Sequence, residues 1–280
     1  MNRQVYYRLI KSRDQKQKTA QAVIVLVRNI RNVMPKLGGR KLYYLLESEL
    51  SELKVGRDKL FRILRANHML IAPRKSYHIT TDSHHRFRKH KNLISSLEID
   101  EPESVWVSDI TYVGTRQNPS YLALTTDAYS KKIMGFNVSN SLALEGSLQA
   151  FEMALKNKKY KTNSLIHHSD RGLQYCSNEY QKMIIDNGIK PSMTEKYDPY
   201  ENAIAERING ILKQEFDVSK NITCLRLKKK LIKNAINIYN NHRPHLSNYM
   251  LTPEQMHQQN KLKRKQYKSK KLSNDVITQL

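Results

Sequence analysis

The sequence has few cysteines and no long hydrophobic run. Cys176 and Cys224 lie far apart, with no second pair to complete a zinc knuckle, so we expect free, buried thiols in a reducing compartment. The longest apolar run, residues 22–27, is too short for a membrane span or a signal-peptide core. No P-loop and no GxGxxG motif occurs, so nucleotide hydrolysis is not indicated. These absences predict a cytoplasmic protein without a membrane partner.

Acidic side chains are also scarce, and the positive charge is concentrated at the two ends. The 280 residues include 49 Lys and Arg against 25 Asp and Glu, a net charge of +24. Residues 1–96 hold 22 basic and 6 acidic side chains, residues 97–260 are close to neutral, and residues 261–280 are basic again. Because cationic side chains that pair with phosphates release counterions, basic flanks around a neutral middle predict DNA binding and association with the nucleoid.

The first part of the chain has helical periodicity. Apolar residues recur on one face over residues 19–33, and Pro35 ends that helix. Two shorter segments follow, "RKLYYLLESEL" and the basic "GRDKLFRILRANHM", which together have the pattern of a helix-turn-helix. From the second segment we expect four DNA contacts: Arg57, Lys59, Arg62 and Arg65. The domain boundaries predicted in this way are 1–72 for a helical DNA-binding domain, 73–98 for a basic linker, 99–260 for a catalytic core and 261–280 for a basic tail.

From residue 104 the period changes from helical to extended. "SVWVSDITYV" alternates with period two and is rich in β-branched and aromatic residues, which predicts a strand with Asp109 in its middle. "YLALTTDAYS" and "KKIMGFNVSN" continue as an antiparallel meander, residues 143–157 read as a helix, and "SLIHH" reads as a fourth strand. A helix over residues 178–187, a strand in "GIKPSMT" and a helix from about Glu201 complete the order βββαβαβα. The fold class predicted is therefore α/β, with a ribonuclease-H-like core behind a small all-α domain.

Three carboxylates would meet at one place in such a core. The first and fourth strands lie side by side in this fold, so Asp109 and Asp170 would be neighbours, and Glu206 projects from the polar face of the last helix. Read alone, Asp170 is about as well explained by a turn or a helix cap. Converging carboxylates repel one another unless a cation lies among them, and all-oxygen ligation suits Mg²⁺ or Mn²⁺. The pattern predicts a site for two divalent ions of the kind used to attack phosphodiesters.

Several blocks of the sequence resemble the DDE transposases of bacterial insertion sequences, whose core is similar to retroviral integrase. These blocks are "WVSDITYV", "YLALTTDAYSKKIMGF", "HHSDRGLQY", "ENAIAERINGILKQEF" and "YNNHRPHLSNYMLTPEQ", and 35 residues separate Asp170 from Glu206, as in that family. The opening "MNRQVYYRLIKS" resembles the second-reading-frame product of this group. The resemblance implies metal-dependent DNA cleavage and strand transfer by the triad Asp109, Asp170 and Glu206. It also implies DNA contacts beside the triad at Asn202, Lys213 and Arg243.

The resemblance further implies partners, and it leaves alternatives open. Element ends and target DNA would be the substrates, the chain would act as a homo-oligomer on DNA, and an upstream reading-frame product is a further possible partner. The sequence departs from the family at Ile208 and Asn209, where bulky aromatic residues often follow the catalytic glutamate, and it lacks the zinc-binding cysteines of retroviral integrases. A DNA-binding regulator with a degenerate core and a simple ribonuclease-H-like nuclease are the alternative interpretations.

Overall fold

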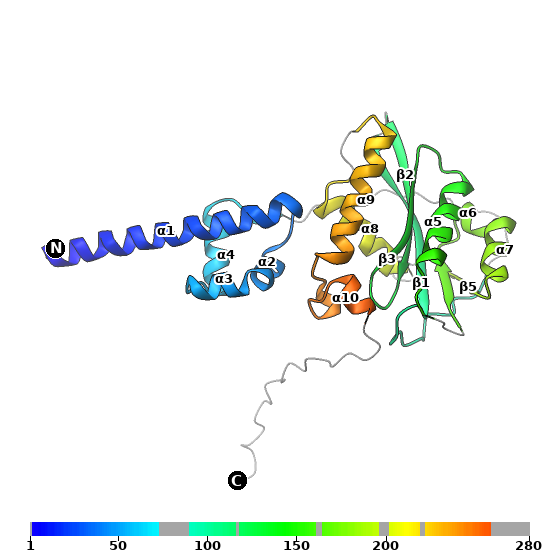
Figure 1. Cartoon of the computed structure of the whole chain (residues 1–280), viewed down its shortest axis with the longest axis horizontal. Helices are drawn as coiled ribbons and strands as arrows, with labels where there is room; N and C mark the ends of the chain where they lie inside the picture. The colour runs from blue at the N-terminus through cyan, green and yellow to red at the C-terminus, as the bar shows by residue number, and fades with distance from the viewer. Residues whose placement is uncertain are drawn as a thin grey trace, which may run out of the picture.

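The protein consists of a helical N-terminal module followed by an α/β core (Figure 1). The computed structural model describes residues 2–72, 90–115, 118–160, 164–195, 202–218 and 222–258. The predicted linker lies mostly, and the predicted basic tail wholly, outside these residues. The helices of the N-terminal module are α1 (Arg3–Val33), α2 (Gly39–Leu45), α3 (Glu47–Glu52) and α4 (Arg57–Ala66).

The N-terminal module differs from the sequence-based prediction in two ways. Helix α1 begins at Arg3 rather than near residue 19, since Asn2 caps its first turn and no glycine or proline interrupts the polar stretch that follows. The second predicted helix is divided into α2 and α3 at Leu46, which leaves helical geometry (φ −105°, ψ 17°). Leu42, Leu46 and Leu50 are all buried, so the break keeps apolar side chains on the core side.

A mixed five-stranded sheet forms the centre of the core. Its strands are β1 (Val105–Thr115), β2 (Asn118–Asp127), β3 (Ile133–Ser139), β4 (Ile166–Ser169) and β5 (Lys190–Met193). The strand order is β3-β2-β1-β4-β5, in which β1 pairs antiparallel with β2 and parallel with β4. The predicted meander and the neighbouring first and fourth strands are thus confirmed, and the order matches the ribonuclease-H-like arrangement predicted from the sequence.

Helices cover both faces of the sheet (Figure 1). The remaining helices are α5 (Leu144–Asn157), α6 (Leu173–Cys176), α7 (Asn178–Asp186), α8 (Ala203–Glu215), α9 (Leu225–Asn241), the 3₁₀ helix η2 (Leu246–Asn248) and α10 (Pro253–His257). On one face Trp106 and Phe151 form a cluster with α7 residues, and on the other Val113 packs with Ile208 and Tyr239 of α8 and α9. The alternation of β1 therefore places its odd-numbered side chains, including Asp109, on the α8 side.

A buried ionic cluster joins the N-terminal module to the core. The Glu215 carboxylate, at the end of α8, accepts hydrogen bonds from Arg243 at 2.6 and 2.7 Å and from Lys41 of α2 at 3.1 Å. Burial alone would raise the pKa of Glu215, but the hydrogen bonds and charge of Arg243, followed by those of Lys41, hold it below its usual range. Lys36 reinforces this contact, since its ammonium lies 2.9 Å from Asp217.

A second buried cluster holds α10 against the end of the sheet where β1 begins and β2 ends. The His257 imidazole lies 3.3 Å from Glu103 and 3.6 Å from Asp127, and all three side chains are fully buried. Burial disfavours the imidazolium, but the carboxylates of Asp127 and Glu103 outweigh it and raise the pKa of His257. A histidine whose charged form is favoured by two carboxylates therefore fixes the C-terminal end of the described core.

Two smaller expectations concern the thiols and the membrane. Both cysteines are free, and Cys176 is buried as expected. Cys224 is exposed, because it lies just before α9, outside the packed face of that helix. Among the described residues, none of the helices combines the length and apolarity that a membrane crossing requires.

We expect Glu215→Gln to lower the free energy of unfolding by on the order of 3 kcal/mol, because it leaves the guanidinium of Arg243 buried without a counter-charge. The wild-type contribution is present above pH 4.5 and is lost as pH falls through the lowered pKa, so the variant should lose stability least at acid pH. Denaturant titration at pH 4 and pH 7 measures this. Asp58→Asn removes an exposed ion pair with Arg57 and should change nothing measurable, so an equal loss in both variants would contradict the interpretation.

His257→Gln should destabilise the protein in a pH-dependent way. Because the pKa of His257 is raised on folding, its contribution is complete below pH 6.5 and is lost as pH rises through the raised value. We expect a loss of about 2 kcal/mol at pH 6 that shrinks toward pH 9. His242, exposed after α9, supplies the matched control His242→Gln. A pH-independent loss in thermal unfolding of His257→Gln would show that packing, not charge, explains the effect.

Candidate active site

Two aspartates meet where β1 and β4 run side by side. Ser108 of β1 is in register with Ser169 of β4, so Asp109 and Asp170 are the next residues on neighbouring parallel strands. Asp109 is partly buried in the middle of β1, and Asp170 directly follows β4. The structure thus brings together the first two predicted catalytic residues.

Helix α8 adds the polar groups that surround Asp109. Its apolar side chains, among them Ile208 and Leu212, are buried against the sheet. The amide of Asn209 donates a 2.7 Å hydrogen bond to Oδ2 of Asp109, and the amide of Asn202 donates a 3.2 Å bond to the carbonyl of Ser108. Glu206 occupies the same polar face and is exposed at its rim.

The three carboxylates lie close enough to change the acidity of Asp109. Burial is the largest cause that raises the pKa of Asp109, and the charge of Asp170 is the next; Glu206 adds a smaller increase. The hydrogen bond from Asn209 acts in the opposite direction, because it stabilises the charged form. Desolvation also raises the pKa of Glu206. The charges of Asp170 and Glu206 therefore add to burial in raising the pKa of Asp109.

The chemistry of these donors fits a divalent cation. Three carboxylates supply only oxygen ligands, which suit Mg²⁺ or Mn²⁺, and a cation among them would relieve the repulsion that raises the pKa of Asp109. Among the described residues, no three His, Cys, Asp or Glu side chains are arranged as a formed metal-ion site. The buried amide oxygens of Asn202 and Asn209 have no hydrogen-bond partner in that part of the chain.

Asp170 also has the local role that the sequence left open. Its Oδ1 accepts a 3.0 Å hydrogen bond from the backbone N–H of Gly172, so the carboxylate closes the turn before α6. Arg171 donates to the carbonyl of Thr194, which ties this turn to the residue after β5. The turn therefore fixes one carboxylate oxygen of Asp170. A role in the turn and a role as a metal ligand are compatible, because the second oxygen is not used by this hydrogen bond.

The histidine pair before Asp170 supports the sheet. His167 Nε2 lies 2.9 Å from the Ser108 hydroxyl and 3.0 Å from the Tyr180 hydroxyl, on the face opposite Asp109. Burial lowers the pKa of His167 to about 3, so the ring is neutral. His168 Nδ1 lies 2.9 Å from the Ser192 hydroxyl. Sequence reasoning missed this network, although the small polar residue at the position of Ser108 in an apolar strand was a signal for it.

The predicted DNA contacts divide into two groups. Arg57, Arg62 and Arg65 are exposed on α4, and Lys59 is partly buried. Near the carboxylates, Lys213 is partly buried and Asn202 is buried. Burial lowers the pKa of Lys213, whereas the charge of Asp109 raises it, which places the ammonium near the triad.

Arg243 departs from its predicted role as a DNA contact. Its side chain is 1% exposed, two of its nitrogens donate to Glu215, and a third donates to the carbonyl of Pro244. A guanidinium engaged in this way is not available to phosphates, so Arg243 is a structural residue here. The resemblance implied a DNA contact at Arg243, whereas its partner in the structure, Glu215, lies 28 residues away in sequence.

The chain is similar to known proteins over its core. Residues 99–199 and 187–253 match two family models that are each described as an integrase core domain. The insertion element IS600 31 kDa protein of Shigella sonnei is 35% identical over 173 residues, 61% of this chain and 63% of that protein. Transposase InsF for insertion sequence IS3fB of Escherichia coli is 32% identical over 160 residues, 57% of this chain and 55% of that protein. The match thus spans under two thirds of each relative.

Among solved structures, the HTLV-2 integrase catalytic core domain in complex with magnesium is 21% identical, with a TM-score of 0.45, and the alignment covers 56% of this chain and 97% of that one. The strand order and the grouped carboxylates agree with the sequence matches to the integrase core domain. The core of the chain, residues 99–253, therefore belongs to the integrase core domain family and is related to the transposases of bacterial insertion sequences.

Proposed function

We propose that the protein cuts DNA at the ends of an insertion sequence and joins those ends to target DNA. The observation that carries this proposal is the grouping of Asp109 on β1, Asp170 directly after β4 and Glu206 on α8 of an integrase core domain, where burial and the charges of the other two carboxylates raise the pKa of Asp109. Relatives that are named as insertion-sequence transposases support the choice of substrate.

In this proposal the three carboxylates hold one or two Mg²⁺ or Mn²⁺ ions. When bound by these carboxylates, such ions would neutralise charge on the phosphate and on the leaving oxygen and would lower the pKa of the attacking water or hydroxyl. Water attacks a phosphorus in line, and the broken P–O bond leaves a DNA 3′-hydroxyl. That hydroxyl then attacks a target phosphorus and displaces a target 3′-oxygen, so no covalent protein intermediate is required.

The chain's own residues would position the carboxylates and the DNA. Asn209 holds Oδ2 of Asp109 and favours its charged form, and Gly172 fixes Oδ1 of Asp170. Lys213, near Asp109, would contact a phosphate beside the scissile bond. The exposed arginines of α4 would hold DNA further from the chemistry, with Arg62 and Arg65 as backbone contacts.

Glu206→Gln should abolish Mg²⁺-dependent cleavage and joining, by roughly 1,000-fold or more, while leaving DNA binding and folding unchanged. The substitution keeps the volume of the side chain but removes one of the three charges. Gel assays with labelled element ends measure cleavage and joining separately. Glu152→Gln, on the exposed side of α5, is the matched control and should keep full activity.

The same assay separates the three interpretations. Cleavage without joining would indicate a simple nuclease, and DNA binding without either reaction would indicate a regulator with a degenerate core. Near wild-type joining by Glu206→Gln would mean that the third carboxylate has been assigned wrongly.

Arg62→Ala should weaken DNA binding and reduce the slope of log affinity against log salt by about 0.9, the share of one phosphate contact. Lys182→Ala is the control, because Lys182 is an exposed cation on α7, across the sheet from the N-terminal module (Figure 1). Titrations at several salt concentrations measure both. An unchanged slope in Arg62→Ala would remove α4 from the DNA-binding surface.

A further inference from the structure

The first half of α1 is a helix without a partner in the described structure. Every side chain from Asn2 to Lys18 is exposed except Val5, which is partly buried. This stretch projects about 24 Å, at 1.5 Å per residue, beyond the rest of the N-terminal module (Figure 1). Isolated helices of this length are marginal in water, so this part of α1 is expected to gain a covering surface.

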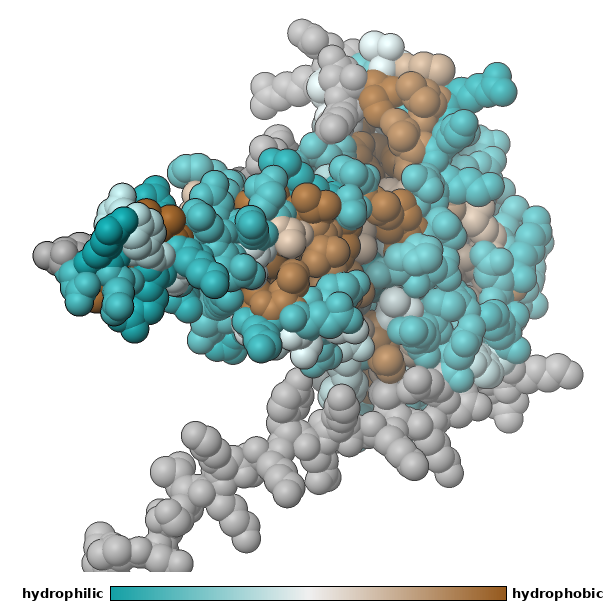
Figure 2. Space-filling model, turned by 60° about the vertical axis from the view of Figure 1, so that its left-hand side comes forward, coloured by the Kyte–Doolittle hydropathy of each residue, from teal (hydrophilic) through white to brown (hydrophobic). Residues whose placement is uncertain are grey.

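The exposed end continues the stripe that packs the rest of α1. Spacings of three and four residues place on one side of the helix Tyr6, Leu9, Arg13, Lys16, Ala20, Val23 and Val27. Val23 and Val27 are fully buried in the module, whereas Tyr6 and Leu9 are 52% and 54% exposed. Figure 2 shows this projecting end as mostly hydrophilic with isolated hydrophobic side chains. The stripe thus needs a surface that accepts both apolar and cationic groups.

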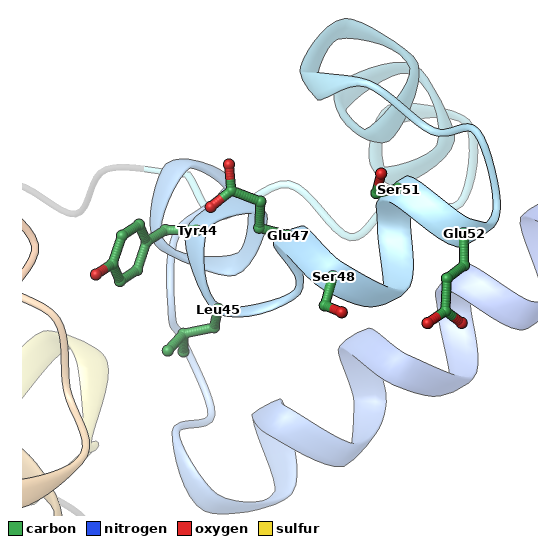
Figure 3. Close-up of a pocket in the computed structure, with 6 residues that line it drawn as sticks. All are labelled: Tyr44, Leu45, Glu47, Ser48, Ser51 and Glu52. Atoms are coloured by element: carbon green, nitrogen blue, oxygen red, sulfur yellow. The ribbon is translucent and has the colours of Figure 1, made fainter.

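A groove of complementary character lies on α2 and α3 of the same module. It has a volume of about 650 Å³ and is lined by Tyr44, Leu45, Glu47, Ser48, Ser51 and Glu52 (Figure 3). Glu47 and Glu52 are exposed, and no ion pair joins either to a basic side chain within the described ranges. These acidic side chains stand in a part of the chain where basic residues greatly outnumber acidic ones.

We propose that the first half of α1 docks into this groove on a second copy of the chain, and that the second copy docks in the same way on the first. Arg13 and Lys16 would then face Glu47 and Glu52, and Tyr6 and Leu9 would face Tyr44 and Leu45. Helix α1 is unbroken from Arg3 to Val33, so its first residues are carried away from the groove of their own chain. Two exposed halves of α1 do not pair with each other, because both are strongly basic.

The contact is reciprocal, so it closes as a two-fold dimer and leaves no open end for further chains. It uses neither the carboxylates of the core nor the exposed arginines of α4. The proposal is therefore independent of the proposed DNA chemistry, and its failure would leave the catalytic assignment standing.

Sedimentation of the full chain without DNA tests the proposal. The wild type should dimerise, and two charge-reversed variants, Arg13→Glu/Lys16→Glu and Glu47→Lys/Glu52→Lys, should each weaken the dimer at least tenfold. A one-to-one mixture of the two variants should dimerise again, because the acidic helix of each first chain faces the basic groove of each second chain. Lys156→Glu/Lys182→Glu, on exposed positions of the core, should leave the dimer unchanged.

Three results would overturn the proposal: a monomeric wild type at all concentrations, a dimer insensitive to both variants, or no recovery in the mixture. If Arg13→Glu/Lys16→Glu weakens DNA binding instead, with no effect on assembly, this part of α1 binds DNA. Tyr6→Ser/Leu9→Ser provides a second measurement. It changes only exposed side chains and should weaken the dimer while circular dichroism shows an intact fold.

Discussion

Repulsion between like charges at the junction of β1 and β4 is the constraint on which the candidate site depends. A parallel pairing of these strands forces Asp109 and Asp170 to be neighbours, and α8 brings Glu206 to the same place. The surrounding structure offsets the repulsion only in part, through the amide of Asn209 and the turn at Gly172. In the proposed function, a divalent cation bound among the carboxylates would relieve the repulsion that remains.

Local patterns in the sequence were sufficient to predict the core. The period of two in β1 placed Asp109 on one face, and the period of α8 placed Asn202, Glu206 and Asn209 on one side. The structure brings these side chains around Asp109 as the register required. Spacing placed Asn209 on the polar face of α8, but its hydrogen bond to Asp109 depends on a tertiary contact that spacing does not reveal.

The predictions that differed concern pairings between distant segments. Arg243 was taken for a DNA contact because an exposed arginine and a buried one look alike in sequence, and Glu215 lies on another helix. The start of α1 was missed because its polar first half lacks a strong apolar face, and Cys224 was expected to be buried because cysteine usually is. In each case the environment of the residue is decided by tertiary contacts, which local sequence patterns do not show.

The cluster around Glu215 has a consequence for how such chains can diversify. Its three members come from the N-terminal module, from α8 and from the segment after α9, and the partly buried Glu215 joins the two buried cations. An exchange of N-terminal modules between related proteins would separate Lys41 from the carboxylate that neutralises it. An exchanged module therefore keeps this contact only where the recipient core has a carboxylate at the position of Glu215, so the module and the core are constrained to change together.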